Sequence, residues 1–100
     1  MVEGKKFDQN KPRWSLIPEG TMSEVLEVLE HGAKKYGVDN WQHVEDGRRR
    51  YYDAAMRHLD AWRHGEKFDL ESGDYHLAHA VCCLLFLIWI DDKELEDVDG

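Results

Sequence analysis

Residues 77–90 read LAHAVCCLLFLIWI, and the eleven positions from Ala80 to Ile90 carry no polar side chain. A helix on a protein surface shows apolar residues on one stripe only, at positions i, i+3, i+4 and i+7. The run is shorter than the roughly 20 residues that cross a bilayer, and Asp91 follows it directly. We therefore predict a buried central helix, with a strand as the alternative, covered by the rest of the fold or by a second copy of the chain. We expect no membrane partner.

The charge of the chain is negative and unevenly distributed. The formal net charge is −8, and residues 91–100, with six acids and one lysine, contribute −5 and leave −3 for residues 1–90. A surface that binds nucleic acid needs a basic face to neutralise phosphates, so we expect no nucleic-acid polymer as partner. A small phosphate-bearing ligand held by a few local cations remains compatible with this charge.

The two cysteines and the first residues indicate the compartment. Cys82 and Cys83 are adjacent, and neighbouring helical positions point about 100° apart, so they are expected to be reduced, buried space-fillers. The first ten residues, MVEGKKFDQN, contain no hydrophobic signal region. Both features favour a cytoplasmic protein.

The pattern predicts an all-α domain, a small bundle of about three helices with an extended N-terminal arm. One hundred residues correspond to one domain, near the lower end of what supports a single core. The prolines at positions 12 and 18 make residues 1–20 an extended arm. Residues 21–90 are the helical domain, and residues 91–100 are an acidic tail. Because eleven consecutive apolar residues exceed what so small a monomer covers, we predict a homo-oligomer through helix 77–90.

Three helices are expected in residues 21–90. The first runs from Thr21, in a capping box with Glu24, to about Tyr36. The second runs from Arg48 to about His64, and its apolar stripe is expected to be buried: Tyr52, Ala55, Met56, Leu59 and Trp62. The third carries His76 and His79 in its first turns and continues through the apolar run.

Several polar side chains have both a structural and a functional interpretation. Glu24, Glu27 and Glu30 recur every three residues, as a solvated face or as oxygen ligands for Mg²⁺. Trp41 beside Asn40 suits stacking and pairing with a base, or the Trp is a lid folded over the core.

The histidines are similarly ambiguous. Arg57 and His58 lie beside the stripe of the second helix, as a solvated Arg and a core-edge His or as ligand contacts. His76 and His79, three residues apart on one face, could hold zinc, but zinc needs three or four strong ligands and the pair alone does not supply them.

Four segments together resemble a known family. They are KPRWSLIP (11–18), GAKKYGVDNW (32–41), AAMRHLDAWRHGEKFDLESG (54–73) and HLAHA (76–80). In this order they are similar to small phage proteins of the dATP/dGTP diphosphohydrolase-like family, which are related to the all-α, MazG-type nucleotide pyrophosphohydrolases. The resemblance implies an all-α, oligomeric protein that acts on purine deoxynucleotides with Mg²⁺.

The resemblance also implies a set of site residues. Carried over position by position, the substrate-binding candidates are Lys11, Arg13, Lys35, Tyr36, Asn40, Trp41, Arg57, His58 and His79. The catalytic candidates are Glu66, Asp69 and His76, and the metal candidates are Glu27, Glu66 and Asp69. One departure concerns the carboxylates: MazG-type enzymes present ExxE and ExxD on two helices, whereas the ExxD here, Glu66 to Asp69, follows Gly65 and is expected in a loop.

Three functions follow as alternatives. The first is a Mg²⁺-dependent pyrophosphohydrolase that cleaves dATP or dGTP into monophosphate and pyrophosphate. The second is a non-catalytic sponge, an anti-defence protein that sequesters a cyclic-nucleotide or ADP-ribose-type immune signal and needs no metal. The third is a structural helical adaptor that uses the apolar helix for assembly.

Overall fold

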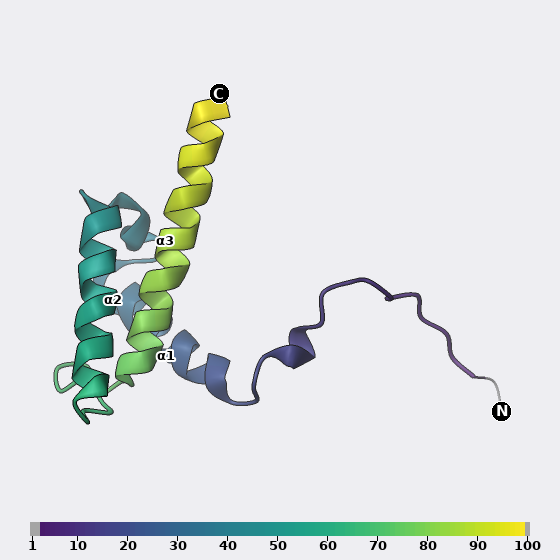
Figure 1. The fold of residues 1–100 in the computed structure, drawn as a ribbon, viewed down its shortest axis with the longest axis horizontal. Coiled ribbons are helices and arrows are strands. Elements are labelled where there is room, and N and C mark those ends of the chain that lie inside the picture. Colours follow the sequence, from purple (N-terminus) through teal and green to yellow (C-terminus); the bar gives the residue numbers. More distant parts are fainter. Residues whose placement is uncertain (1–2, 100) are drawn as a thin grey trace.

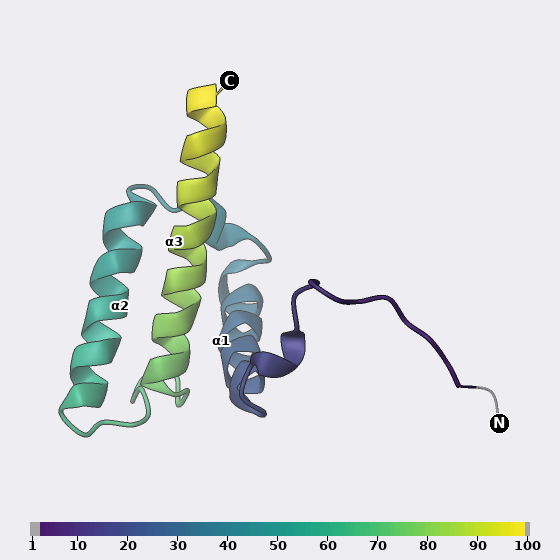
Figure 2. The same cartoon turned by 45° about the vertical axis from the view of Figure 1, so that its right-hand side comes forward.

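The computed structural model describes the backbone of residues 3–99, in which three α-helices stand side by side (Figures 1 and 2). These are α1 (Thr21–Tyr36), α2 (Gly47–Arg63) and α3 (His76–Asp99), with two 3₁₀ helices, η1 (Trp14–Leu16) and η2 (Asn40–His43). Within the described residues, strand pairing is limited to one isolated bridge. The fold is therefore all-α, as the periodicity predicts.

Helix α1 has the predicted bounds but not the predicted cap. The N-cap position is Gly20, with φ +83°, and no side chain caps the helix. Thr21 is already helical, and its hydroxyl donates to the carbonyl oxygen of Pro18 at 2.7 Å. The left-handed backbone at Gly20 makes the turn into α1, because a residue without Cβ adopts it without strain. The expected capping box is therefore wrong.

The core lies where α1 and α2 pack against α3. Val25 of α1 meets Ala78 and Cys82 of α3, and the thiol of Cys82 donates to the carbonyl oxygen of Val25 at 3.5 Å. Ala55 of α2 and Ala80 of α3 are also buried. These side chains are small, so the helices approach closely and the polar residues beside them are brought together.

The side of α2 that packs inside the chain is not the apolar stripe that the sequence predicts to be buried. Of its predicted stripe, Ala55 is buried, whereas Tyr52 and Met56 are about half exposed. The reason is that α2 turns another face towards α3, which includes Tyr51 and His58. The apolar periodicity of this helix therefore does not mark the side on which it packs within one chain.

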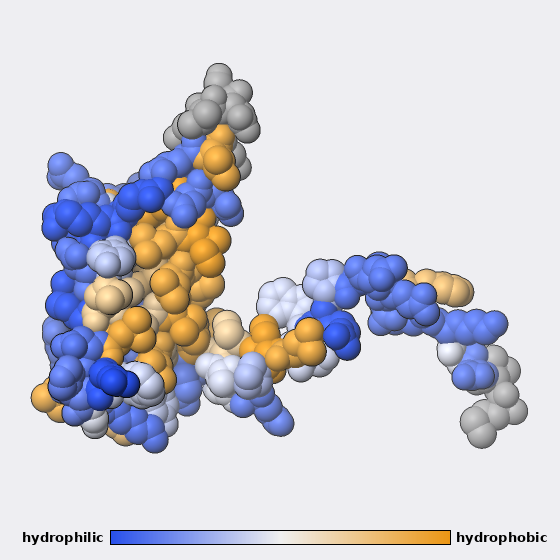
Figure 3. All heavy atoms as spheres, in the orientation of Figure 1, coloured by the Kyte–Doolittle hydropathy of each residue, from blue (hydrophilic) through white to orange (hydrophobic). Residues whose placement is uncertain are grey.

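Helix α3 is longer and less covered than expected. It does not end where the apolar run ends but continues through Asp99, so the acidic tail is helical over residues 91–99 and projects beyond the other helices (Figure 2). Leu84, Leu85 and Ile88 are 50%, 40% and 59% exposed, and a continuous hydrophobic area follows α3 in Figure 3. Despite this length, none of the helices formed by the described residues has an apolar stretch sufficient to span a membrane.

The segment before α1 runs away from the three helices (Figure 1). Residues 3–20 are exposed along their length, and Trp14 is 80% exposed. Within one chain, the side chains of this segment are therefore not packed on the bundle.

Candidate functional site

The connection between α2 and α3 folds back on itself and carries two candidate site residues, Glu66 and Asp69. Phe68 and Tyr75 form an antiparallel bridge, and the His76 N–H donates to the Lys67 carbonyl at 3.0 Å. Gly73, with φ +79°, makes the reversal. This short turn places Asp69 opposite the first turns of α3.

His76 lies at the centre of the cluster. It is 4% exposed and begins α3. Its Nε2 lies 2.9 Å from Oε1 of Glu66, and its Nδ1 lies 2.8 Å from Nδ1 of His58. A carboxylate on one ring nitrogen fixes the tautomer and the orientation of the ring. In neutral His76 the Nε2–H donates to Glu66, and Nδ1 is the acceptor that faces His58.

His79 extends the cluster by one helical turn. Its ring stacks on that of His58, with centroids 4.5 Å apart and planes at 6°. Its Nε2 lies 2.7 Å from the hydroxyl oxygen of Ser72. The Ser72 N–H in turn donates to Oδ2 of Asp69 at 2.9 Å, so the turn and α3 hold each other in register.

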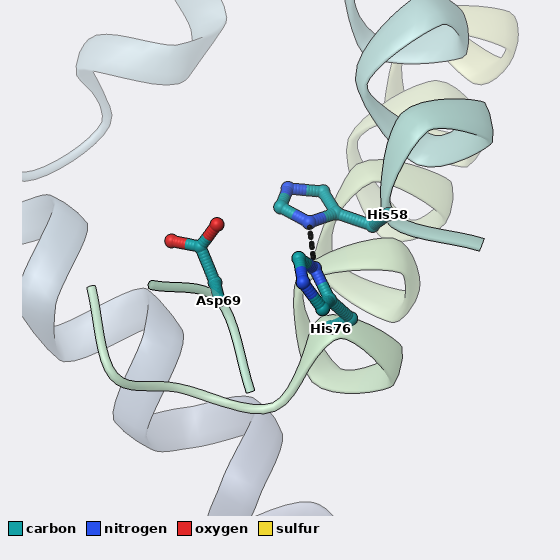
Figure 4. Close-up of side chains that lie close together, drawn as sticks. All are labelled: His58, Asp69 and His76. Carbon is teal, nitrogen blue, oxygen red and sulfur yellow. Dashed lines mark hydrogen bonds between the residues drawn. The ribbon is translucent and has the colours of Figure 1, made fainter. Parts of the chain in front are cut away.

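Asp69 faces the histidine pair from the opposite side. Figure 4 shows the Asp69 carboxylate beside the rings of His58 and His76, with one of its oxygens on the side of His58. Each of these three residues offers one potential ligand atom, and the three atoms lie within 4.8 Å of one another. Three side chains from α2, the connection and α3 therefore surround one small space.

A second polar group lies on α1. Nδ1 of His31 lies 2.7 Å from Oδ2 of Asp74, which is 6% exposed, and Glu27 completes the group. The Asp74 N–H donates to the Ser72 hydroxyl at 3.2 Å, which links the two groups. The sequence analysis did not single out His31. Its spacing of four residues from Glu27, on one helix face, is the signal that could have found it.

Burial favours the neutral forms of His58 and His79. It lowers the pKa of His58 to about 4, and the charges of His79 and His76 act in the same direction. Burial likewise lowers the pKa of His79. Burial alone would raise the pKa of Asp69, but the hydrogen bonds from Ser72 outweigh it and hold that pKa below its ordinary value. At neutral pH His58 and His79 are therefore neutral imidazoles, and Asp69 is a carboxylate.

The structure brings five predicted site residues together and separates the others. The cluster contains His58, Glu66, Asp69, His76 and His79. Arg57 is next to His58 on α2 and is exposed. Lys35 and Tyr36 are exposed in the last turn of α1, with the Lys35 ammonium 5.1 Å from the Tyr36 ring centroid.

The remaining candidates lie elsewhere. Lys11 and Arg13 are exposed in the segment that runs away from the helices. Asn40 begins η2, and Trp41 stacks on Phe86 with centroids 4.4 Å apart and contacts Trp89 edge-on at 5.0 Å. This is the lid arrangement, ten residues along α3 from His76, and base stacking by Trp41 stays a prediction.

The three carboxylates named as Mg²⁺ candidates do not form one group among the described residues. Mg²⁺ prefers oxygen ligands in octahedral geometry. Among the described residues, however, Glu27 is grouped with His31 and Asp74, and Asp69 is grouped with two histidines. Glu66 belongs to neither group and is engaged with His76. The site is rich in imidazole nitrogen and does not match an all-oxygen set.

Fold and cluster together define a small all-α domain with a histidine–carboxylate site. Residues 1–99 match the family model described as dATP/dGTP diphosphohydrolase, N-terminal, and the chain belongs to this family. It is 40% identical over 89 residues to a dATP/dGTP diphosphohydrolase of Salmonella phage PMBT28, a match that covers 89% of this chain and 30% of that protein. The chain thus spans about a third of the relative's length. No solved structure matches it.

Proposed function

We propose that this domain binds a purine deoxynucleoside triphosphate and hydrolyses it to the monophosphate and pyrophosphate at the cluster of His58, Glu66, Asp69, His76 and His79. The observation that carries the proposal is the contact of buried His76 with Glu66 on one nitrogen and His58 on the other. Family membership supplies the substrate class, since the phage relative is named for dATP and dGTP.

The reaction needs a water molecule, a proton acceptor and cations. The water oxygen attacks the α-phosphorus, the bond from that phosphorus to the oxygen bridging to the β-phosphate breaks, and pyrophosphate leaves. In the metal-free site His76 is the group proposed to take the water proton, at Nδ1 once that atom is released from its contact with His58, because Glu66 orients the ring and stabilises the imidazolium that forms. Arg57, beside His58, and Lys35, on α1, are the cations proposed to neutralise the phosphates.

A groove lined by residues of all three helices and of the connection offers room for the base. It has a volume of about 530 Å³ and lies between the starts of α1 and α3 and the end of α2. Trp62, Tyr75 and Leu77 are among the lining residues, and Lys67 adds a cation. Small-molecule sites are concave, mostly apolar and about 300–1,000 Å³ in volume. None of the five cluster residues lines the groove, so the proposal requires the phosphates to extend from it past Tyr75 and Lys67 to reach the cluster.

Product analysis tests the proposal. The chain is incubated with dATP or dGTP in Mg²⁺, in Mn²⁺, in Zn²⁺ or in EDTA, and the nucleotides are separated. Monophosphate and pyrophosphate should appear, and Glu66→Gln should lower the rate by about 100-fold, which is typical for loss of acid–base assistance. Glu45→Gln, at an exposed carboxylate outside the cluster, is the control. Equal rates in the two variants would remove Glu66 from the reaction.

The sponge remains the second candidate, and one observation favours it. Of the carboxylates proposed for Mg²⁺, Glu27 and Asp69 lie in separate groups and Glu66 lies in neither, whereas binding needs only the groove and the cations. This alternative extends to cyclic-nucleotide or ADP-ribose-type signals. Stoichiometric retention in EDTA, with every nucleotide recovered intact in all metal arms, would replace hydrolysis by sequestration.

A further inference from the structure

We propose that His58, Asp69 and His76 form a binding site for one divalent transition-metal ion of the zinc class. The family description assigns no ion to these residues, and of the three only Asp69 was among the Mg²⁺ candidates. The proposal concerns the metal alone and does not depend on hydrolysis of a nucleotide.

Geometry is the first support. One potential ligand atom from each of the three residues lies within 4.8 Å of the other two, and Figure 4 shows the carboxylate and the two rings around a common space. The two Nδ1 atoms are 2.8 Å apart. Tetrahedral zinc, with Zn–N bonds of about 2.0–2.1 Å, needs its nitrogen ligands slightly further apart, at about 3.3 Å. A small rotation of the His58 ring, which is only half buried, supplies the difference.

The hydrogen bond that orients His76 and fixes its tautomer is the second support. Metal-bound histidines usually donate their other N–H to a carboxylate or carbonyl, which fixes the tautomer and makes the ligand nitrogen more basic. Glu66 has this relation to His76, at 2.9 Å from Nε2. When the ion binds, the Nδ1 proton of His58 leaves for solvent and Nε2 of the same ring takes one up. Both imidazoles then remain neutral, with their Nδ1 lone pairs on the metal.

The kind of ion follows from the donor atoms. Imidazole suits zinc, copper, iron and nickel, whereas Mg²⁺ prefers carboxylate, carbonyl and water oxygen. Two histidines and one carboxylate supply three of the four ligands of a tetrahedral site, and an ion with three protein ligands keeps a position for water or a ligand. The His76–His79 pair found in the sequence supplies only two ligands, which is too few to hold a zinc ion. The third ligand comes from the turn, and the second histidine comes from α2.

Metal titration of the full chain tests the site. The chain is stripped with chelator and titrated with Zn²⁺, Co²⁺, Mn²⁺ or Mg²⁺ by calorimetry, and the Co²⁺ form is read by its visible absorption. We expect one equivalent of Zn²⁺ or Co²⁺ per chain, bound at least about 100-fold more tightly than Mg²⁺. His58→Ala and Asp69→Asn should each lower the affinity by about 100-fold, and Asp69→Asn keeps an acceptor for the Ser72 N–H.

Two further variants test the site. One replaces a histidine outside it, and the other replaces the carboxylate that orients His76. His64→Ala, at an exposed histidine near the end of α2, should leave the affinity unchanged. Glu66→Gln keeps a hydrogen-bond acceptor for His76 and should lower the affinity by about 10-fold, the usual size of a loss of ligand orientation. Circular dichroism checks that each variant is folded.

Several outcomes would overturn the proposal. They are the absence of stoichiometric binding to the stripped chain, equal affinities for Zn²⁺ and Mg²⁺, and unchanged affinity in folded His58→Ala and Asp69→Asn. Loss of binding in His31→Ala with retention in His58→Ala would also overturn it, because the ion would then occupy the group on α1.

Discussion

The imidazole rings of His58 and His79 lie flat against each other, with centroids 4.5 Å apart and planes at 6°. Two stacked imidazolium ions would repel each other, and burial already disfavours the charge on each ring. The packing of α2 on α3 therefore depends on both histidines being neutral, which gives the domain a predictable response to acid.

Stability should fall as the pH falls from about 6.5 to about 4. The pKa of His58 is about 4 in the folded chain and near 6.5 when unfolded, so the unfolded chain binds more protons in this window. His79, whose pKa is also lowered, acts with the same sign in this window, and the lowered pKa of Asp69 adds a loss of the same sign only around and below pH 4. Chemical denaturation at pH 7 and at pH 5 measures the effect. His58→Gln should show a smaller loss of stability between these values, whereas the exposed-site control His64→Gln should show the full loss.

Trp41→Ala should lower the free energy of unfolding by about 2–3 kcal/mol. A fully buried Trp replaced by Ala costs about 3–5 kcal/mol, and Trp41 is only partly buried against Phe86 and Trp89. Denaturant titration gives the value, and Trp41→Phe, which keeps a ring on Phe86, should recover most of the lost stability.

Calorimetry with dATP on the Trp41→Ala variant tests the predicted base stacking. A further loss of about 1–3 kcal/mol in binding would support that role, and unchanged affinity would remove it.

A second copy of the chain is predicted to cover the exposed face of α3. Leu84, Leu85 and Ile88 form an apolar surface that water contacts in one chain, and such surfaces mark interaction sites. Light scattering should give a mass of two or more chains, and Ile88→Glu should shift it towards the 11.8 kDa of one chain. Leu70→Glu, at a residue 89% exposed in the connection, should leave the mass unchanged. A single-chain mass for the unaltered protein at micromolar concentration would contradict the prediction.

Both cysteines should be unreactive in the folded protein. Burial raises the pKa of Cys82 to about 12 and also raises that of Cys83, so neither side chain forms the thiolate that reacts with a disulfide reagent. Ellman's reagent at pH 8 should modify both thiols per chain only after denaturation. Modification of the native chain at the rate of a free thiol would show that α3 opens.

The sequence by itself determined the helices and the local half of the cluster. The bounds of α1 follow from its periodicity and from Gly37 at its end. The family resemblance singled out Glu66, Asp69 and His76 together. Helical spacing could not have done so, because Glu66 and Asp69 lie in the connection before α3. Their contact needs only the short turn closed by the Phe68–Tyr75 bridge. Such local relations are encoded in a few neighbouring residues.

Only the tertiary structure decided which distant side chains join the cluster. His58 reaches His76 across 18 positions, and His31 reaches Asp74 across 43. Both contacts depend on how α1 and α2 cross α3, which is set by the close packing of small residues such as Val25, Ala78 and Cys82. Periodicity cannot reveal this packing: it predicted the wrong buried side of α2 and did not distinguish a Trp41 that binds a base from one that covers Phe86. These relations arise from the shapes of side chains that meet only when the helices are assembled.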